Sequence, residues 1–173
     1  TAADSAQAKN QSLAPYYFLL RLVCNNPAAL GVTRDEFGQE LAERYPKLIT
    51  GAASAKLEMV LDKIEAIRDS GDKVVLFTKW TNLSLFLLGE AMRKRKIGHV
   101  LHYGTGQTDR QADEAVRRFK NEHEVTVFAS SDAGAYGLNL QEARYVINYE
   151  CPYSYDVLMQ RGDRINRADS FLD

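Results

Sequence analysis

The sequence contains only two cysteines among its 173 residues, Cys24 and Cys151. They lie far apart and without a neighbouring pair of histidines, so the sequence predicts neither a disulfide framework nor a zinc site. Long apolar runs are also missing, because none approaches the roughly 18 residues that would span a bilayer. No signal-peptide pattern opens the chain either. We therefore expect an intracellular protein, cytoplasmic or nuclear, without a membrane partner.

An excess of charge of either sign is missing as well. The formal net charge is −1, with 26% charged and 45% hydrophobic residues, which is ordinary for a globular protein. The chain as a whole does not attract nucleic acid, so any such binding needs a local patch. The basic run at residues 93–96 is one candidate. We prefer the interpretation that it ends a helix, where the helix dipole favours cations.

Helical and strand patterns alternate through most of the chain. Apolar residues recur at helical spacing over 55–69, and helices are also expected over 83–95 and 109–120. Thr108 opens the last of these with a capping box. Short apolar runs predict buried strands at 73–78, 99–103, 125–130 and 145–150. Crossovers of this length join parallel strands, so the sequence predicts an α/β fold.

Two further helices are expected ahead of this pattern. Residues 13–24 are rich in aromatic residues and leucine, and Asn-Asn-Pro at 25–27 would stop that helix. Thr33 begins a capping-box pattern for a helix over 34–45. Pro46 would close this second helix, because proline lacks the N–H that a helix interior needs.

The composition also suggests domain boundaries. Residues 1–12 are rich in Ala, Ser, Gln and Asn, and we expect them to be disordered or part of a longer chain. Residues 13–53 would form a helical appendage, with the joint at 51–54. Residues 54–173 would form the α/β domain, truncated at its C-terminus.

A predicted strand that ends in glycine-rich sequence carries the first functional signal. EVTVFASS at 124–131 is followed by Gly134 and Gly137, which let the backbone approach a ligand closely. In open α/β sheets, the ligand crevice lies at the carboxyl ends of the strands. The pattern therefore favours a ligand site after this strand.

QRGDRINR at 160–167 carries the second signal. We expect a short helix here, with Gln160, Arg164 and Arg167 on one side. Two guanidiniums one turn apart need water or an anion, and their fork of donors matches phosphate oxygens. The alternative, favoured for an isolated RxxR, is a solvated face that pairs with nearby Asp163 and Asp169.

Together, residues 129–140 and 160–167 resemble the fifth and sixth motifs of superfamily-two helicases and translocases. Residues 56–87 are similar to the segment that opens the second lobe of Swi/Snf-related DNA translocases, and 19–30 to what precedes that lobe. Asp163, where many relatives have glycine, favours the Swi/Snf-like group. The resemblance implies a RecA-like three-layer sandwich, with a mainly parallel sheet flanked by helices, beside the N-terminal helical appendage.

The resemblance also implies a DNA-dependent ATPase or translocase of which this chain is one part. The sequence lacks the Gly-Lys-Ser/Thr phosphate loop and the acidic box that would hold ATP with Mg²⁺. ATP with Mg²⁺ would therefore bind mainly to a first, N-terminal RecA-like lobe, and this fragment should be inactive without it. Arg164 and Arg167 would be arginine fingers, and Gln160 would orient them or the attacking water. Gly137 and Asn139 match positions that meet the nucleotide.

By the same resemblance, the loops after the first two strands contact nucleic acid, expected to be duplex DNA. The candidates for touching the DNA backbone are Lys79, Thr105 and Ser131. The family's glycine, arginine and phenylalanine in this region would be Gly104, Arg110 and Phe119. The interval between Arg110 and Phe119 is looser than is usual in the family.

Aromatic residues and histidines have simpler interpretations. Trp80 could stack on a base, a contact worth about 1–3 kcal/mol, or it could pack in the core. Tyr153 and Tyr155 could line the ligand crevice, although packing is the preferred interpretation. The three histidines lack metal-ligand spacing, and we predict structural roles for them.

Two other classes of function stay open. One is a non-catalytic nucleic-acid or protein-binding module derived from such a lobe, which would show no ATPase even when joined to its upstream sequence. A Gly-Lys phosphate loop upstream would favour the motor instead. The other is a small nucleotide-binding enzyme complete in itself, which would bind ATP without a second lobe.

Overall fold

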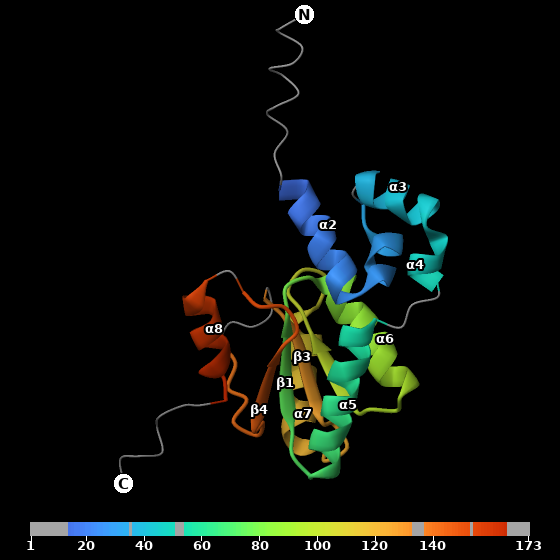
Figure 1. The fold of residues 1–173 in the computed structure, drawn as a ribbon. Helices are drawn as coiled ribbons and strands as arrows, with labels where there is room; N and C mark the ends of the chain where they lie inside the picture. The colour runs from blue at the N-terminus through green and yellow to red at the C-terminus, as the bar shows by residue number, and fades with distance from the viewer. Residues whose placement is uncertain (1–13, 35, 51–53, 133–136, 153, 166–173) are drawn as a thin grey trace, which may run out of the picture. The chain divides into compact units, whose positions relative to one another are not determined.

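The computed structural model describes residues 14–34, 36–50, 54–132, 137–152 and 154–165. The chain divides into two compact units, Thr1–Ser54 and Ala55–Asp173. The first unit contains helices, and the second contains a sheet with helices packed on it (Figure 1).

The helices of the first unit are α2 (Ala14–Asn25), the 3₁₀ helix η2 (Pro27–Val32), α3 (Glu36–Arg44) and α4 (Pro46–Thr50). Leu22 of α2 and Leu30 of η2 are buried. Asn26 separates α2 from η2, and its side-chain oxygen accepts the N–H of Ala28 at 3.1 Å. An asparagine at this position satisfies a backbone donor that the helix leaves free.

The helix that we expected to end before Pro46 does so, but Pro46 has a second role. α3 ends at Arg44, and Pro46 is the first residue of a further short helix, α4. Proline fits the first helical position because the backbone N–H there has no partner within the helix. Proline is thus as typical of a helix start as of a helix end.

The second unit is built on four strands, all paired in parallel: β1 (Val74–Thr78), β2 (His99–His102), β3 (Val127–Ser131) and β4 (Tyr145–Asn148). Their order in the sheet is β2-β3-β1-β4. Each strand forms where the sequence predicts an apolar run. In the register, Thr78 lies opposite Ser131, so β1 and β3 end at the same level.

Helices cover both faces of this sheet, as Figure 1 shows. α5 (Ala55–Asp69) and α6 (Phe86–Lys94) pack on the face that carries Val74 and Leu76. α7 (Asp109–Asn121) packs on the opposite face, which carries Val75 and Phe77. Successive side chains of a strand point to opposite faces, so a strand buried on both faces needs a continuous apolar run. These three layers confirm the predicted fold class.

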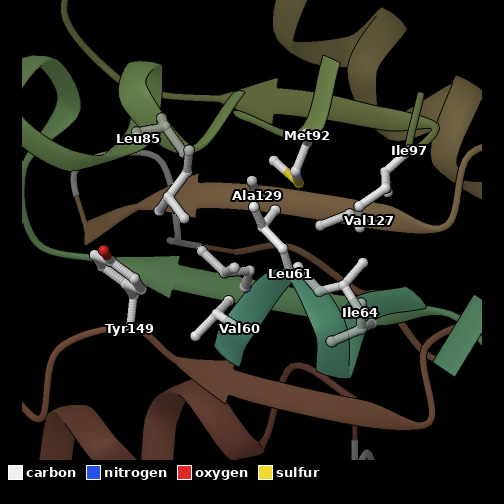
Figure 2. Packing of buried hydrophobic residues seen from close by; sticks show 12 residues of the cluster. Val60, Leu61, Ile64, Leu85, Met92, Ile97, Val127, Ala129 and Tyr149 are labelled. Atoms are coloured by element: carbon white, nitrogen blue, oxygen red, sulfur yellow. The ribbon is translucent and has the colours of Figure 1, made fainter. Parts of the chain in front are cut away.

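The core on the α5 and α6 side is close-packed and apolar. Figure 2 shows Leu61 and Ile64 of α5 directed at Val127 and Ala129 of β3. Met92 of α6 enters the same cluster and is fully buried. Burial of each large side chain contributes about 1.5–3 kcal/mol, so this core fixes the sheet on which the site is built.

The ends of α5 and α7 follow from local sequence. The backbone N–H of Gly71 donates to the carbonyl of Arg68 at 2.9 Å, and Gly71 has a φ of +81°, which ends α5 as glycine commonly does. At the start of α7, Thr108 Oγ1 accepts the N–H of Gln111 at 3.3 Å. Gln111 Oε1 accepts the N–H of Thr108 at 3.0 Å, which confirms the predicted capping box.

A π-helical turn, η3 (Thr81–Leu85), precedes α6. The N–H of Leu85 donates to the carbonyl of Trp80, five residues earlier, at 3.0 Å. Such turns hold one residue more than an α-helical turn. Ser84 and Leu85 both point inward and are buried. No pattern in the sequence predicts this turn.

The last described helix is α8 (Tyr155–Gly162), on the side of the sheet that ends in β4 (Figure 1). It begins and ends earlier than the helix that we expected over 160–167, and a turn at 163–165 follows it. Arg164 therefore does not lie on the same helix as Gln160. Within the described ranges, no helix has both the length and the hydropathy needed to cross a membrane.

Candidate functional site

The strands of the second unit end at one edge of the sheet, which we call the carboxyl edge. Thr78 ends β1, Ser131 ends β3, and Glu150 follows β4 by two residues. The exposed fractions of these three residues are 0%, 1% and 3%. Buried polar groups are costly unless they are hydrogen-bonded. Their partners therefore indicate how this edge is built.

The carboxylate of Glu150 joins the end of β1 to the end of β4. Its Oε1 accepts the hydroxyls of Thr78 at 3.0 Å and Ser84 at 2.8 Å. Its Oε2 accepts the backbone N–H of Lys79 at 2.8 Å. Hydrogen bonds to an ionised acceptor are about twice as strong as neutral ones. Glu150 therefore fixes the loop after β1 although it lies 72 residues from Thr78 in sequence.

Arg161 of α8 is the second buried charged residue at this edge, with 3% of its surface exposed. Its guanidinium binds the carboxylate of Asp132 through Nε at 3.2 Å and through Nη2. Nη1 donates to Asn148 Oδ1 at 2.8 Å and to the carbonyl of Glu150 at 3.3 Å. The guanidinium also lies 5.4 Å from the ring centroid of Phe77. Arg161 therefore anchors α8 to the sheet.

Arg164 lies three residues later in a different environment. Its backbone N–H donates to the carbonyl of Arg161 at 3.4 Å, and its own carbonyl accepts the N–H of Leu140 at 2.9 Å. Its side chain is partly exposed and forms no ion pair or hydrogen bond with any described residue. The alternative pairing with Asp163 is therefore not observed. Arg167 and Asp169 lie outside the described residues.

The other predicted nucleotide contacts lie in two segments: Gly137 and Asn139 precede β4, and Gln160 lies on α8. Gly137 has a φ of +75°, and a Cβ added there would meet no atom of the described residues within 4 Å. The backbone conformation, rather than lack of space, therefore favours glycine. Asn139 Oδ1 is buried and has no hydrogen-bond partner among the described residues. The bond from Leu140 to Arg164 brings this segment to the turn that carries Arg164, whereas Gln160 is exposed on the last turn of α8.

The three predicted DNA contacts differ in exposure. Lys79 is exposed directly after β1, and its Nζ lies 5.7 Å from the ring centroid of Trp80, which is half-buried. Thr105 is exposed in the turn after β2. Ser131 is 1% exposed, and its Oγ has no hydrogen-bond partner in the described part of the chain. A phosphate could not reach Ser131 in this conformation.

The segment between β2 and α7 is held by Gln107. Its Oε1 accepts the N–H of Tyr103 at 2.7 Å, and its Nε2 donates to the carbonyl of Leu101 at 3.1 Å. Gly104 begins the turn between them, and Arg110 is exposed on the first turn of α7. A cavity of about 360 Å³ lies beside Arg110, between β2 and α7. Phe119, in contrast, is fully buried in the core.

The basic run at residues 93–96 is partly neutralised within its own unit. Arg93 binds Glu90 at 2.6 Å. Arg95 binds Asp62 at 2.6 Å and Glu65 at 2.9 Å, and it also binds Glu58. The hydrogen bond to Asp62 is the largest of the effects that raise the pKa of the Arg95 guanidinium, and Glu58 adds to it. These contacts match a structural role for the run.

Two aromatic predictions have different outcomes. Tyr155 is 72% exposed at the start of α8, so the preferred interpretation of packing is wrong for this residue. Tyr153 lies outside the described residues. His102 is buried and lies 5.3 Å from the ring of Phe128. Burial lowers the pKa of His102, so the neutral ring adds no charge to the carboxyl edge at pH 7.

Sequence reasoning missed Glu150 and Arg161, which make most of the polar contacts at the carboxyl edge. Each had a weak signal. Glu150 ends the apolar run that predicts a strand over 145–150, and the carboxyl ends of strands face the ligand side of an α/β sheet. Arg161 lies between two residues that were predicted to be functional. Among the described residues, no group of three or more potential ligands could hold a metal ion.

Comparison with known proteins gives a consistent result. Residues 55–169 match the family model of the helicase conserved C-terminal domain. The "ATP-dependent helicase fft2" of Schizosaccharomyces pombe is 31% identical over 116 residues, which cover 66% of this chain and 9% of that protein. The "Putative ATP-dependent helicase/translocase YwqA" of Bacillus subtilis is 28% identical over 149 residues, covering 86% and 15%. The chain thus spans a small part of these relatives.

Two solved structures share the fold. The C-terminal part of the Fun30 ATPase domain has a TM-score of 0.62 at 20% identity, over 75% of this chain and 44% of that one. The C-terminal domain of the Sulfolobus solfataricus SWI2/SNF2 ATPase has a TM-score of 0.51 at 21% identity, over 79% and 65%. Similarity at this level of identity is evidence of a common architecture.

Proposed function

We propose that this chain completes an ATP site on a first RecA-like lobe by supplying arginine fingers. The chain belongs to the helicase conserved C-terminal domain family and to its Swi/Snf-related group. Arg164 and Arg167 are these fingers. They bind the γ-phosphate and stabilise the charge that develops when it is transferred, an effect commonly worth roughly 10³–10⁵ in rate. The chain acts as one lobe of a DNA-dependent motor.

The contrast between Arg161 and Arg164 carries this proposal. Arg161 is satisfied by Asp132 and Asn148, whereas Arg164 has no anionic partner among the described residues. A guanidinium needs water or an anion, and a triphosphate provides anionic oxygens that match its fork of donors. The turn after α8 presents that donor fork without a partner in the described part of the chain.

The segment that precedes β4 fits the remainder of a nucleotide. The buried oxygen of Asn139 lacks a described partner, and a ribose hydroxyl or a phosphate-bound water would satisfy it. Gly137 keeps the backbone free of a side chain nearby. Gln160 orients the fingers or the attacking water. Mg²⁺ is held mainly by the first lobe, so this chain hydrolyses no ATP without that lobe.

On the other side of the carboxyl edge, Lys79 and Thr105 grip the backbone of duplex DNA. Lys79 is exposed after β1 and Thr105 is exposed after β2, with β3 between these two strands in the sheet. An ammonium and a hydroxyl are ordinary phosphate ligands. Ser131 joins this contact only in a conformation that exposes its hydroxyl. Duplex DNA and the first lobe are therefore the partners of this chain.

The test uses the longer protein that contains this chain, with and without duplex DNA. We expect Arg164→Ala and Arg167→Ala each to lower DNA-stimulated ATPase by about 10³-fold, with DNA affinity nearly intact. Arg117→Ala is the matched control, because Arg117 is exposed on α7 and binds Glu114. ATPase at the normal rate in both finger variants would rule out the assignment. No ATPase in the unmodified protein would favour a non-catalytic binding module.

A further inference from the structure

We infer that Glu150 is a positioning residue that couples the DNA side of the carboxyl edge to its nucleotide side. The inference rests on the motor function proposed above. Glu150 is neither a finger nor an exposed DNA contact, yet it is a charged side chain with only 3% of its surface exposed. Its contacts reach both sides of the site.

On the DNA side, Glu150 holds the backbone from which Lys79 projects. Its Oε2 accepts the N–H of Lys79 at 2.8 Å. Its Oε1 accepts the hydroxyls of the residues that flank this loop, Thr78 and Ser84. A displacement of Lys79 towards or away from a phosphate therefore acts directly on the carboxylate of Glu150.

On the nucleotide side, the main chain of Glu150 is held by α8. The carbonyl of Glu150 accepts Nη1 of Arg161 at 3.3 Å. The carbonyl of Arg161 in turn accepts the N–H of Arg164 at 3.4 Å. Two residues, Glu150 and Arg161, thus connect Lys79 to Arg164 through consecutive hydrogen bonds.

Both connecting residues are buried, which makes this connection stiff. Arg161 is held by Asp132 and Asn148 as well as by Glu150. Separating a buried charge from its partner strongly destabilises the folded protein. A shift at one end is therefore transmitted to the other end rather than absorbed locally. Such a link produces a coupling free energy between the two ligands, and linkage makes this coupling reciprocal.

The coupling is measured as a ratio in the longer protein. The dissociation constant for a short DNA duplex is determined without nucleotide and with a saturating non-hydrolysable ATP analogue. We expect the ratio of the two constants to differ from one by about 5- to 150-fold, the usual range for coupled sites. Because a global loss of stability lowers both affinities together, it leaves this ratio unchanged.

Glu150→Gln is the main variant, since glutamine has the same shape but replaces one accepting oxygen with a donor. We expect it to bring the ratio at least about fivefold closer to one. Ser84→Ala removes one donor and keeps the charge, so it should act in the same direction with a smaller change. This second variant keeps the inference testable if Glu150→Gln fails to fold.

Glu142→Gln is the control, because Glu142 binds Lys120 at 3.6 Å, away from the carboxyl edge. Its ratio should equal that of the unmodified protein. If folded Glu150→Gln and Ser84→Ala both keep the unmodified ratio, the positioning role is wrong although the motor function stands. If the unmodified protein shows no DNA-stimulated ATPase, the proposed function is wrong, and this inference, which rests on it, is wrong as well.

Discussion

The arginines at the end of α6 and those at the end of α8 look alike in the sequence but face different surroundings. Arg95 follows α6 and contacts three carboxylates of α5. Arg161, in the last turn of α8, has a buried, hydrogen-bonded guanidinium. Arg164, just after this helix, has a guanidinium without a described partner. The role of an arginine cluster therefore depends on the anions that the fold places beside it.

This difference separates structural cations from those available to a ligand. Arg95 has its anions in its own unit, so an external phosphate would have to compete with three carboxylates. Arg164 has no such competitor among the described residues. The predictions below test this division, beginning with the largest expected effect.

Replacing arginine by lysine should show the largest difference between the turn after α8, which carries Arg164, and the end of α6, which carries Arg95. Lysine keeps the charge but loses the planar fork that matches phosphate oxygens. We expect Arg164→Lys to lower DNA-stimulated ATPase of the longer protein by about 10²-fold or more. Arg95→Lys should leave it within about twofold, because a lysine still meets the same carboxylates. Equal losses in the two variants would contradict the comparison.

Arg161→Met should destabilise the fold rather than remove a ligand contact. It leaves the carboxylate of Asp132 and the amide of Asn148 without their donor. Breaking a buried pair costs about 3–5 kcal/mol, and we expect about 3 kcal/mol because Asp132 is 39% exposed. Denaturant unfolding measures this loss. The double variant with Asp132→Leu should recover part of it, and no recovery would show that the pair is not the cause.

Arg95→Ala should have a smaller effect that depends on salt. The variant leaves Glu58, Asp62 and Glu65 close together without their shared cation. We expect the midpoint of thermal unfolding to fall by about 2–4 °C at low salt. The loss should shrink at 1 M salt, where the Debye length is about 3 Å. A loss independent of salt would indicate that Arg95 acts by packing.

Arg93→Ala should have the smallest effect, because Arg93 and Glu90 are both well exposed. Exposed pairs of this kind contribute little. The expected midpoint of thermal unfolding lies within about 1 °C of the unmodified protein, and DNA binding by the longer protein should be unchanged. Weaker DNA binding would restore the interpretation of residues 93–96 as a nucleic-acid patch.

The strands and most helices were predictable because their signals are local. Four apolar runs became four strands, α5 has the predicted bounds, and the capping box at Thr108 forms as expected. Each depends on residues within one turn or one strand. The departures at Pro46 and at the π-helical turn arise where one local pattern permits two conformations.

The site was predictable only in part. Lys79 and Thr105 are exposed where the motifs placed them, whereas Ser131 is buried. Glu150 and Arg161 escaped prediction because their roles depend on partners far away in sequence. The residues joined by the bond between Thr78 and Glu150 are 72 positions apart. A charged residue after a strand gives no information about which donors the fold brings to it.

The extra residue in the π-helical turn has a consequence for insertions and deletions. It rotates Ser84 inward, to within 2.8 Å of Glu150 Oε1. An α-helical turn advances each residue by about 100°. Deleting one residue between Trp80 and Ser84 would therefore restore ordinary helical winding and swing the hydroxyl away from the carboxylate. At this position the number of residues, as well as their identity, is constrained, so chains that keep this contact should all have the same length here.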